Sequence, residues 1–444
     1  MSEPVLERGL GLTGATATNL LGMIGVGPFL TLPIMLSAMN GPHIAYAWVL
    51  GAVLALCDGL VYAQLAAALP GSGGPYLYLR EAYRPFGLGK LMSFLFIFQV
   101  MLVAPLSIAA GAVGFASYLG FFLTLSPLAS NLVAAVVCAL MTALLYRPIA
   151  SVGRISVAML VVVILTVGWV IVAGCFSFSW AQAFDFPPAA YRFDRDLFAR
   201  VGAVSLLAMY NYGGYNNVCN IGDEIRSPEK TMPRAIVGSI LLVVALYLLL
   251  STVVLGTIPW TEAVKSKTIA SDFIARTFHD PARGAQAAAI MTALILFVTA
   301  SSLYAVILGY SRIPYAAAKD GQFFSVFARV HPTKCFPHVS LLTLGALSLP
   351  FCLVSLGDLV NWLILVQILS QFVWQCAGVI LLYRYRKDLK HPFVMWLYPW
   401  PAVACLILWM GVYLTADRTG QLFGLAFVSA GVVAHWAFER RRGT

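Results

Sequence analysis

The chain has 444 residues, of which 60% are hydrophobic and only 10% are charged. Soluble domains carry about 25% charged residues, so most of this chain cannot face water. This excludes a soluble enzyme, a nucleic-acid-binding protein and a disordered protein as first interpretations. The formal net charge is +10, from 28 basic and 18 acidic residues. A polyanionic partner could explain that excess, and so could basic loops that orient a membrane protein.

Apolar segments follow one another along almost the whole chain. A helix that spans a bilayer needs about 20 mostly apolar residues. By that criterion the sequence predicts twelve spans, near residues 13–38, 43–69, 88–119, 130–147, 151–176, 197–221, 234–259, 284–316, 338–356, 359–383, 393–415 and 418–438. An even number places both termini on one side of the membrane. The predicted fold class is all-α, a polytopic membrane protein.

The distribution of basic residues tests this topology. Loops on the side of the termini contain 20 of the 28 lysine and arginine residues, and the opposite loops contain 8. The acidic residues divide 9 to 8, with Asp58 left inside a predicted span. A bias of basic residues alone is what the positive-inside rule predicts. We therefore expect a multi-pass protein of the cell membrane with both termini cytoplasmic, a lipid bilayer as surroundings and no nucleic-acid partner.

Two predicted spans contain sequences that interrupt a helix. In the first span, GMIGVGPF (residues 22–29) places three glycines within six positions, followed by Pro28. In the sixth, MYNYGGYNN (residues 209–217) flanks Gly213 and Gly214 with aromatic residues and asparagine. Glycine is a poor helix former, and proline removes a backbone donor. Close helix packing through glycine is the alternative, but it explains less well a second cluster five spans after the first.

Helix interruptions at matching positions of two halves are typical of the central site of a transporter. Unpaired backbone is tolerated in a membrane only where it lines a cavity or is buried in protein. Free N–H groups at a half-helix N-terminus attract a carboxylate, and freed carbonyl groups accept hydrogen bonds from an ammonium group. We therefore expect a zwitterion to bind at Gly22, Met23, Ile24, Gly25, Val26, Gly27, Tyr210, Asn211, Tyr212, Gly213, Gly214, Tyr215 and Asn216.

Four stretches resemble the amino acid–polyamine–organocation (APC) superfamily of transporters. GMIGVGPF is similar to the first-helix GxIGxGIF, apart from Pro28. Residues 63–87 resemble the signature between the second and third helices, and residues 210–236 resemble the sixth helix with its acidic loop ending in PRAI. SRIPYAAAKDG, residues 311–321, matches SRxxYAxAxDG of the eighth helix. Within the superfamily the chain is most similar to L-type amino acid transporters and polyamine-uptake permeases.

The resemblance implies a leucine-transporter-type core of two inverted five-helix repeats, with helices 1 and 6 broken. It implies secondary transport of amino acids by alternating access, as symport or exchange; the alternative is proton-coupled uptake of polyamines or other organic amines. A channel and a transport-inactive sensor stay open. The implied domains are residues 1–12 (cytoplasmic N-terminus), 13–176 (first repeat), 177–196 (external loop), 197–383 (second repeat), 384–438 (peripheral helices 11 and 12) and 439–444 (cytoplasmic tail).

Three positions depart from the patterns of relatives. Gln64 stands where many relatives have glutamate, and Asn216 stands where the polyamine branch has aspartate. Val163 aligns with a fifth-helix lysine of some proton-coupled members. The coupling ion, H⁺ or Na⁺, is therefore not assigned by the resemblance.

Three side chains are candidates for ion coupling. Asp58 lies deep in a predicted span, where a charge is expensive and usually functional or paired. It could couple transport to protons or recognise an amine, or it could be a neutral, hydrogen-bonded acid. Ser301 and Ser302 lie on the eighth span, where related folds place hydroxyl ligands of a sodium ion; hydrogen bonding of serine to its own helix is the alternative.

Charged residues at the predicted cytoplasmic mouth are candidates for a gate. Asp223 and Glu224 lie close in sequence to Arg226, Lys230 and Arg234, and Arg154 begins the fifth span. Solvated loop charges are the alternative, since exposed ion pairs contribute about 0–1 kcal/mol.

No pattern in the sequence predicts an enzyme. The eight cysteines contain no CxxC pair and the six histidines show no metal-ligand spacing, so we expect no metal site and no cofactor. A GxxxxGK[ST] motif is absent, which disfavours direct use of ATP. The predicted partners are a small amino acid or amine and a coupling ion.

Overall fold

The computed structural model describes residues 8–192 and 194–442, without the side chains of residues 150, 189, 441 and 442. Parts of the predicted N-terminal segment 1–12 and of the predicted tail 439–444 lie outside these residues. Within the described chain the regular structure is helical, and the only β-type pairings are isolated bridges between Leu10 and Ile225 and between Ser72 and Ile221.

Among the described residues, nine helical segments are long and apolar enough to cross a membrane. They are α1–α2 (Leu12–Met23 and Gly27–Met39), α3 (Ala45–Ala68), α5 (Gly89–Leu119), α6 (Pro127–Leu144), α7 (Ile149–Cys175), α11 (Pro228–Thr257), α14 (Pro281–Lys319), α16–α17 (Leu356–Gln367 and Val373–Tyr385) and α19 (Arg418–Arg442). The prediction of an all-α polytopic membrane protein is confirmed.

Helices outside this group of nine occupy the remaining three predicted spans. They are α9 (Arg195–Tyr212) with α10 (Asn217–Asn220), α15 (His338–Ser348) and α18 (Trp400–Thr415). The eleventh predicted span begins too early, at residue 393, because the helix starts only at Trp400, between Pro399 and Pro401. Helix α4 (Pro75–Tyr83) lies in a stretch for which no helix was predicted.

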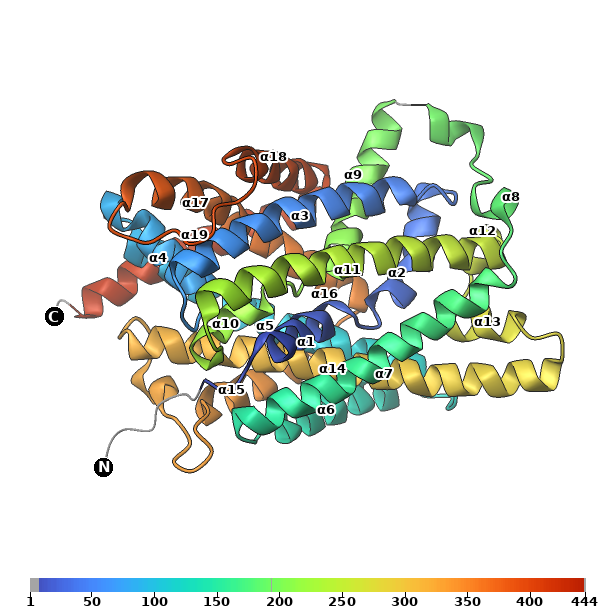
Figure 1. Ribbon diagram of the computed structural model, residues 1–444, viewed down its shortest axis with the longest axis horizontal. Coiled ribbons are helices and arrows are strands. Elements are labelled where there is room, and N and C mark those ends of the chain that lie inside the picture. The colour runs from blue at the N-terminus through green and yellow to red at the C-terminus, as the bar shows by residue number, and fades with distance from the viewer. Residues whose placement is uncertain (1–7, 193, 443–444) are drawn as a thin grey trace.

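The helices run roughly along the long axis of the molecule (Figure 1). Helix α19 ends at one end of the molecule, which we call the terminal end, whereas α8 (Trp180–Ala183), α12 (Trp260–Ala263) and α13 (Ile269–Arg276) lie at the opposite end. An ion pair of 3.7 Å between Lys90 and Glu439 joins α5 to α19 at the terminal end. The end of α19 therefore lies beside the start of α5.

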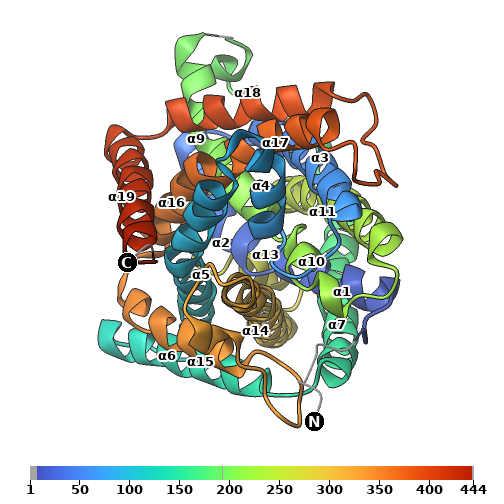
Figure 2. The same cartoon turned by 90° about the vertical axis from the view of Figure 1, so that its left-hand side faces the viewer.

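Burial separates central helices from peripheral ones. In the most apolar stretch of α1–α2, 72% of the residues are buried, against 11% in α19. Seen from the terminal end, α18 and α19 lie at the edge of the assembly, while α5 and α2 lie inside it (Figure 2). Helix α3 packs against α11, α9 and α18. The two interrupted helices are thus enclosed by protein, as unpaired backbone in a membrane requires.

Candidate substrate-binding site

The first break separates α1 from α2. Helix α1 ends at Met23, residues 24–26 are not helical, and α2 begins at Gly27 with Pro28 in its first turn. Proline is tolerated there because the first N–H groups of a helix have no intrahelical partner. No hydrogen-bond partner occurs for the N–H groups of Val26 and Gly27 among the described residues. These two groups are donors at the N-terminus of α2.

The second break separates α9 from α10. Helix α9 ends at Tyr212, and the turn 213–216 leads into α10 at Asn217. Gly214 has φ +108°, a conformation that residues with a side chain rarely adopt. A Cβ atom at Gly214 would also lie 2.7 Å from the carbonyl carbon and oxygen of Gly22. The two breaks therefore touch backbone to backbone, which requires glycine at this position.

Three polar side chains that the sequence analysis missed hold the breaks in place. Asn19 on α1 donates to the carbonyl of Tyr215 (2.6 Å) and accepts from the N–H of Val218 (2.8 Å). Asn217 donates to the carbonyl of Ala305 on α14 (2.7 Å). The Tyr247 hydroxyl on α11 donates to the carbonyl of Met23 (2.6 Å). Asparagine within an apolar span was the available signal for the first two.

A cavity of about 130 Å³ lies at the meeting point of the breaks. Its lining residues come from α1, α2, α5, α9, α14, α16, the segment Ile368–Phe372 after α16, the two breaks and α18: Gly22, Met23, Gly25, Val26, Gly27, Ser107, Gly111, Met209, Tyr210, Asn211, Gly213, Gly214, Tyr215, Asn216, Thr299, Ser302, Leu303, Val306, Tyr310, Leu363, Ile364, Gln367, Phe372 and Trp409. This lining includes no lysine, arginine, histidine, aspartate or glutamate from the described part of the chain.

Eleven of the thirteen predicted substrate-binding residues line this cavity. The exceptions are Ile24, which is buried, and Tyr212, whose hydroxyl donates to the carbonyl of Trp48 (3.3 Å). The Asn211 amide nitrogen donates to the Thr31 hydroxyl (2.7 Å), and its side-chain oxygen has no hydrogen-bond partner in the described chain. That oxygen is a buried acceptor in the cavity wall.

The two serines predicted for ion coupling differ in their surroundings. The Ser301 hydroxyl donates to the carbonyl of Phe297 on its own helix (2.8 Å), which is the alternative considered for it. Ser302 lines the cavity, and a Cβ atom at Gly25 would lie 2.9 Å from the Ser302 hydroxyl. Only Ser302 therefore faces the first break.

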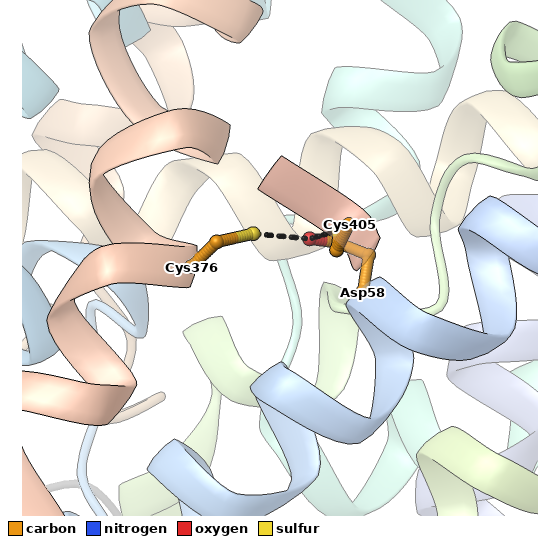
Figure 3. A group of neighbouring side chains, drawn as sticks. All are labelled: Asp58, Cys376 and Cys405. Atoms are coloured by element: carbon orange, nitrogen blue, oxygen red, sulfur yellow. Dashed lines mark hydrogen bonds between the residues drawn. The ribbon is translucent and has the colours of Figure 1, made fainter. Parts of the chain in front are cut away.

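Asp58 lies behind the cavity wall rather than in it. Its carboxylate is fully buried and accepts hydrogen bonds from the Tyr215 hydroxyl (2.5 Å) and the Trp409 indole (3.5 Å). The thiols of Cys405 (3.4 Å) and Cys376 (3.8 Å) also donate to it. Figure 3 shows the Cys376 thiol of α17 pointing toward the Asp58 carboxylate on α3, with Cys405 of α18 overlapping Asp58 in this view. The hydrogen bonds account for the arrangement, and we assign no metal to it.

The predicted gate residues do not form one group. Glu224 pairs with Arg312 of α14 (3.1 Å), and both side chains are buried. Burial raises the pKa of Glu224 above its ordinary value, although Arg312 acts in the opposite direction. Arg154 is exposed, and no ion pair of the described residues includes it. The partner of Glu224 is therefore Arg312, 88 residues along the chain, and not one of the nearby basic residues.

Further polar contacts join elements at the terminal end. Glu81 of α4 pairs with Arg386 (2.6 Å), beyond α17, and Arg80 pairs with Asp320, beyond α14. Burial opposes ionisation of Glu81, but hydrogen bonds from Arg386 and Arg80 outweigh it and lower the pKa of this carboxyl. Arg226 and Glu224 also hydrogen bond the backbone of Leu10 through their own backbone groups (2.8 and 3.0 Å). These contacts tie α4, α14 and the α10–α11 connection together.

Similar proteins match this chain over most of its length. It is 23% identical to the serine/threonine exchanger SteT of Bacillus subtilis, over 99% of this chain and 98% of that protein. It is 26% identical to the branched-chain amino acid permease BcaP of Bacillus subtilis, over 88% and 84%. It is 25% identical to the human large neutral amino acids transporter small subunit 2, over 97% and 80%.

A family model described as amino acid permease matches residues 10–429. This match includes both breaks, the residues that line the cavity and Asp58. It also confirms the resemblance to the APC superfamily that the sequence motifs indicated. The chain belongs to the amino acid permease family.

Proposed function

We propose that this protein transports neutral amino acids across the cell membrane by alternating access, with the substrate bound between the two breaks. The observation that carries the proposal is the uncharged cavity at the meeting point of the broken helices. The N–H groups of Val26 and Gly27 suit a carboxylate at the N-terminus of α2, and the side-chain oxygen of Asn211 suits an ammonium group. A zwitterion satisfies both ends without a charged side chain.

The uncharged lining also bears on the alternative, uptake of polyamines or other amines. A second amine would need a carboxylate within hydrogen-bonding reach, because an unpaired charge is costly away from water. Asp58 does not line the cavity, and Asn216 is uncharged. We therefore favour neutral amino acids over diamines and cationic amino acids. The names of the relatives (serine/threonine exchanger, branched-chain amino acid permease, large neutral amino acids transporter) agree with this choice.

The basic loops support a cytoplasmic location of the terminal end. In that orientation the Glu224–Arg312 pair lies at the cytoplasmic end of the site, and we propose that it separates when this end opens. Asp223 belongs to the same connection, whereas Arg154 has no described ion pair to break. We propose Asp58 as the coupling residue, for a proton; Ser302, which lines the cavity beside the first break, is the alternative, for a sodium ion. We assign no catalytic residue, since the family is one of permeases.

Uptake into proteoliposomes tests this function. Radiolabelled leucine and serine are offered together with an excess of unlabelled alanine, leucine, serine, arginine or putrescine, with imposed proton or sodium gradients. We expect the neutral amino acids to compete, arginine and putrescine to compete weakly, and uptake to persist in sodium-free buffer. Competition by putrescine alone would contradict the proposed substrate class, and strict dependence on sodium would assign coupling to Ser302 instead of Asp58.

A further inference from the structure

We infer that Tyr215 links substrate occupancy of the cavity to protonation of Asp58, so that a proton is bound together with the amino acid. This inference rests on the proposed function, because it needs a substrate in the cavity. Its basis is the position of one side chain: Tyr215 lines the cavity and also donates to the buried carboxylate.

The surroundings of Asp58 contain donors but no cation. No lysine, arginine or histidine of the described residues hydrogen bonds or faces its carboxylate. The titratable groups that face it are thiols and phenols: Cys57 and Tyr62 on α3, Tyr215 in the second break, Cys219 on α10, Cys376 on α17 and Cys405 on α18. Packed against α3, helices α9 and α11 bring no charged group to it. The carboxylate therefore depends on hydrogen bonds alone.

One of those hydrogen bonds is much shorter than the others. The Tyr215 hydroxyl lies 2.5 Å from one carboxylate oxygen, whereas the other oxygen receives the indole and the two thiols at 3.4–3.8 Å. Thiols are weak donors, and hydrogen bonds weaken with distance. Tyr215 is thus the principal donor that stabilises an ionised Asp58, and its departure favours the protonated, uncharged carboxyl.

The position of Tyr215 in the break makes it sensitive to substrate. Residues 213–216 form the turn between α9 and α10 and line the cavity. The Asn19 side chain donates a hydrogen bond to the carbonyl of Tyr215. The rings of Tyr215 and Tyr62 pack edge to face, with their centroids 5.8 Å apart. A substrate that packs against this turn competes for the space of the Tyr215 side chain. Displacement of the hydroxyl then leaves Asp58 to take up a proton from the cavity.

The consequence is a thermodynamic linkage. If substrate binding raises the affinity of Asp58 for a proton, proton binding raises the affinity for substrate by the same factor. The two ligands then occupy the same state of the protein, which makes it a proton symporter. For one fully linked proton, the dissociation constant of the substrate rises by about tenfold per pH unit.

Proton counting on the purified full-length protein tests the inference. L-leucine, with L-serine as a second probe, is added to the protein in weakly buffered detergent solution, and proton uptake is followed with a pH indicator alongside binding of the radiolabelled amino acid. We expect the wild-type protein to take up about one proton per amino acid bound. Asp58→Asn should bind the amino acid without proton uptake and with an affinity independent of pH. Tyr215→Phe changes a residue of the cavity wall, so its readout is the ratio of protons taken up to amino acid bound, which should fall to zero whatever its affinity.

Tyr304→Phe is the matched control. Tyr304 is a buried tyrosine of α14 that does not line the cavity, and its hydroxyl has no hydrogen-bond partner in the described chain. This variant should take up protons as the wild type does. Unchanged proton uptake in Tyr215→Phe, or binding without proton uptake in the wild type, would overturn the inference.

The outcomes also separate this inference from the proposed function. A wild-type protein that binds neither amino acid contradicts the proposed function itself. A wild-type protein that binds one of them without protons contradicts only the linkage. If Asp58→Asn does not fold, Tyr215→Phe still decides the matter, because it keeps the carboxyl and removes only the hydroxyl.

Discussion

Gly22 and Gly214 meet where the two interrupted helices approach each other. At most glycines of the chain a methyl group would find a side chain able to move or no neighbour at all, but at Gly214 it would meet the backbone of Gly22. The positive φ of Gly214 adds a second restriction. The contact between the two breaks thus requires a residue without a Cβ atom at position 214.

Gly214→Ala should abolish transport. The methyl group would strain the backbone by about 1–3 kcal/mol and push the second break away from the first. We expect uptake in proteoliposomes to fall more than about tenfold. Gly168→Ala is the control, because Gly168 lies in α7 with no atom within 4 Å of the added carbon. Wild-type uptake by Gly214→Ala would show that the contact between the breaks is dispensable.

Glu224→Ala should destabilise the protein through its partner. It would leave the buried Arg312 guanidinium without a counter-charge, which typically costs about 3–5 kcal/mol. Arg283→Ala removes an exposed ion pair with Asp280 (3.6 Å) and should cost less than about 1 kcal/mol. Denaturant unfolding in detergent measures both.

Removing both charges should recover part of the loss. Glu224→Leu combined with Arg312→Met leaves no buried charge unpaired, so we expect it to be more stable than Glu224→Ala. If Glu224→Ala and the wild-type protein unfold at the same denaturant concentration, the Glu224–Arg312 pair does not stabilise the terminal end.

The positions of the two helix breaks were predictable from the sequence, because glycine and proline disfavour a helix at their own positions. The breaks at residues 24–26 and 213–216 fall within the two sequences singled out for them. The contacts of Asp58 were not predictable, since Tyr215, Cys376 and Cys405 lie 157 to 347 residues further along the chain. The partner of Glu224 was expected nearby and is Arg312 instead. Spacing within one sequence does not encode such pairings.

Two elements escaped the sequence analysis for local reasons. Helix α4 begins at Pro75 after Gly73 and Gly74, both with positive φ, and its nine residues are too few to be found by a search for spans of about 20 apolar residues. Between α16 and α17, residues Ile368–Phe372 form a π-helical segment that hydropathy cannot distinguish from α-helix. The two inverted repeats stay a prediction from the resemblance.

Glu81 connects α4 to the segment after α17, and its contribution should depend on pH. Its pKa is lowered in the folded protein, so its stabilising effect is present above the ordinary carboxyl value of 4.5 and is lost as the pH falls through the lowered value. At pH 7 we expect Glu81→Gln to be less stable by about 1 kcal/mol. This difference should shrink on acidification below pH 4.5.

The control for Glu81 is Arg84→Gln. Arg84 is the outer partner of the same carboxylate (3.4 Å), with 70% of its side chain exposed. Unfolding in denaturant at several pH values measures each variant. A Glu81→Gln penalty that stays constant from pH 7 into the acid range would contradict a role for the ionised carboxylate.

The whole molecule presents one end with the chain termini and an opposite end formed by α8, α12 and α13 (Figure 1). The ion pairs of Glu224, Glu81 and Arg80 all lie toward the terminal end. These contacts join α4, α14, the α10–α11 connection and the segment after α17, so an opening that separated these elements on that side would break them. Alternating access would therefore involve several elements at once.

Labelling of intact cells tests the orientation. We expect epitope tags at both termini to be inaccessible to impermeant antibodies until the cells are permeabilised, because the basic loops favour the cytoplasm. A cysteine introduced by Ser266→Cys, between α12 and α13, should react with an impermeant maleimide in intact cells. The background variant lacks the exposed Cys175, replaced by serine. Tags accessible in intact cells would reverse the assigned orientation.

In the proposed mode of binding, unpaired backbone at the two breaks holds a neutral amino acid. A cryo-electron microscopy structure determined with a saturating concentration of L-leucine, and again with L-serine, tests it most directly. We expect density in the cavity for at least one of them, with the carboxylate against the N–H groups of Val26 and Gly27 and the amine toward Asn211. Density elsewhere in the molecule, or a cavity still empty at saturation with an amino acid that the protein transports, would contradict the account.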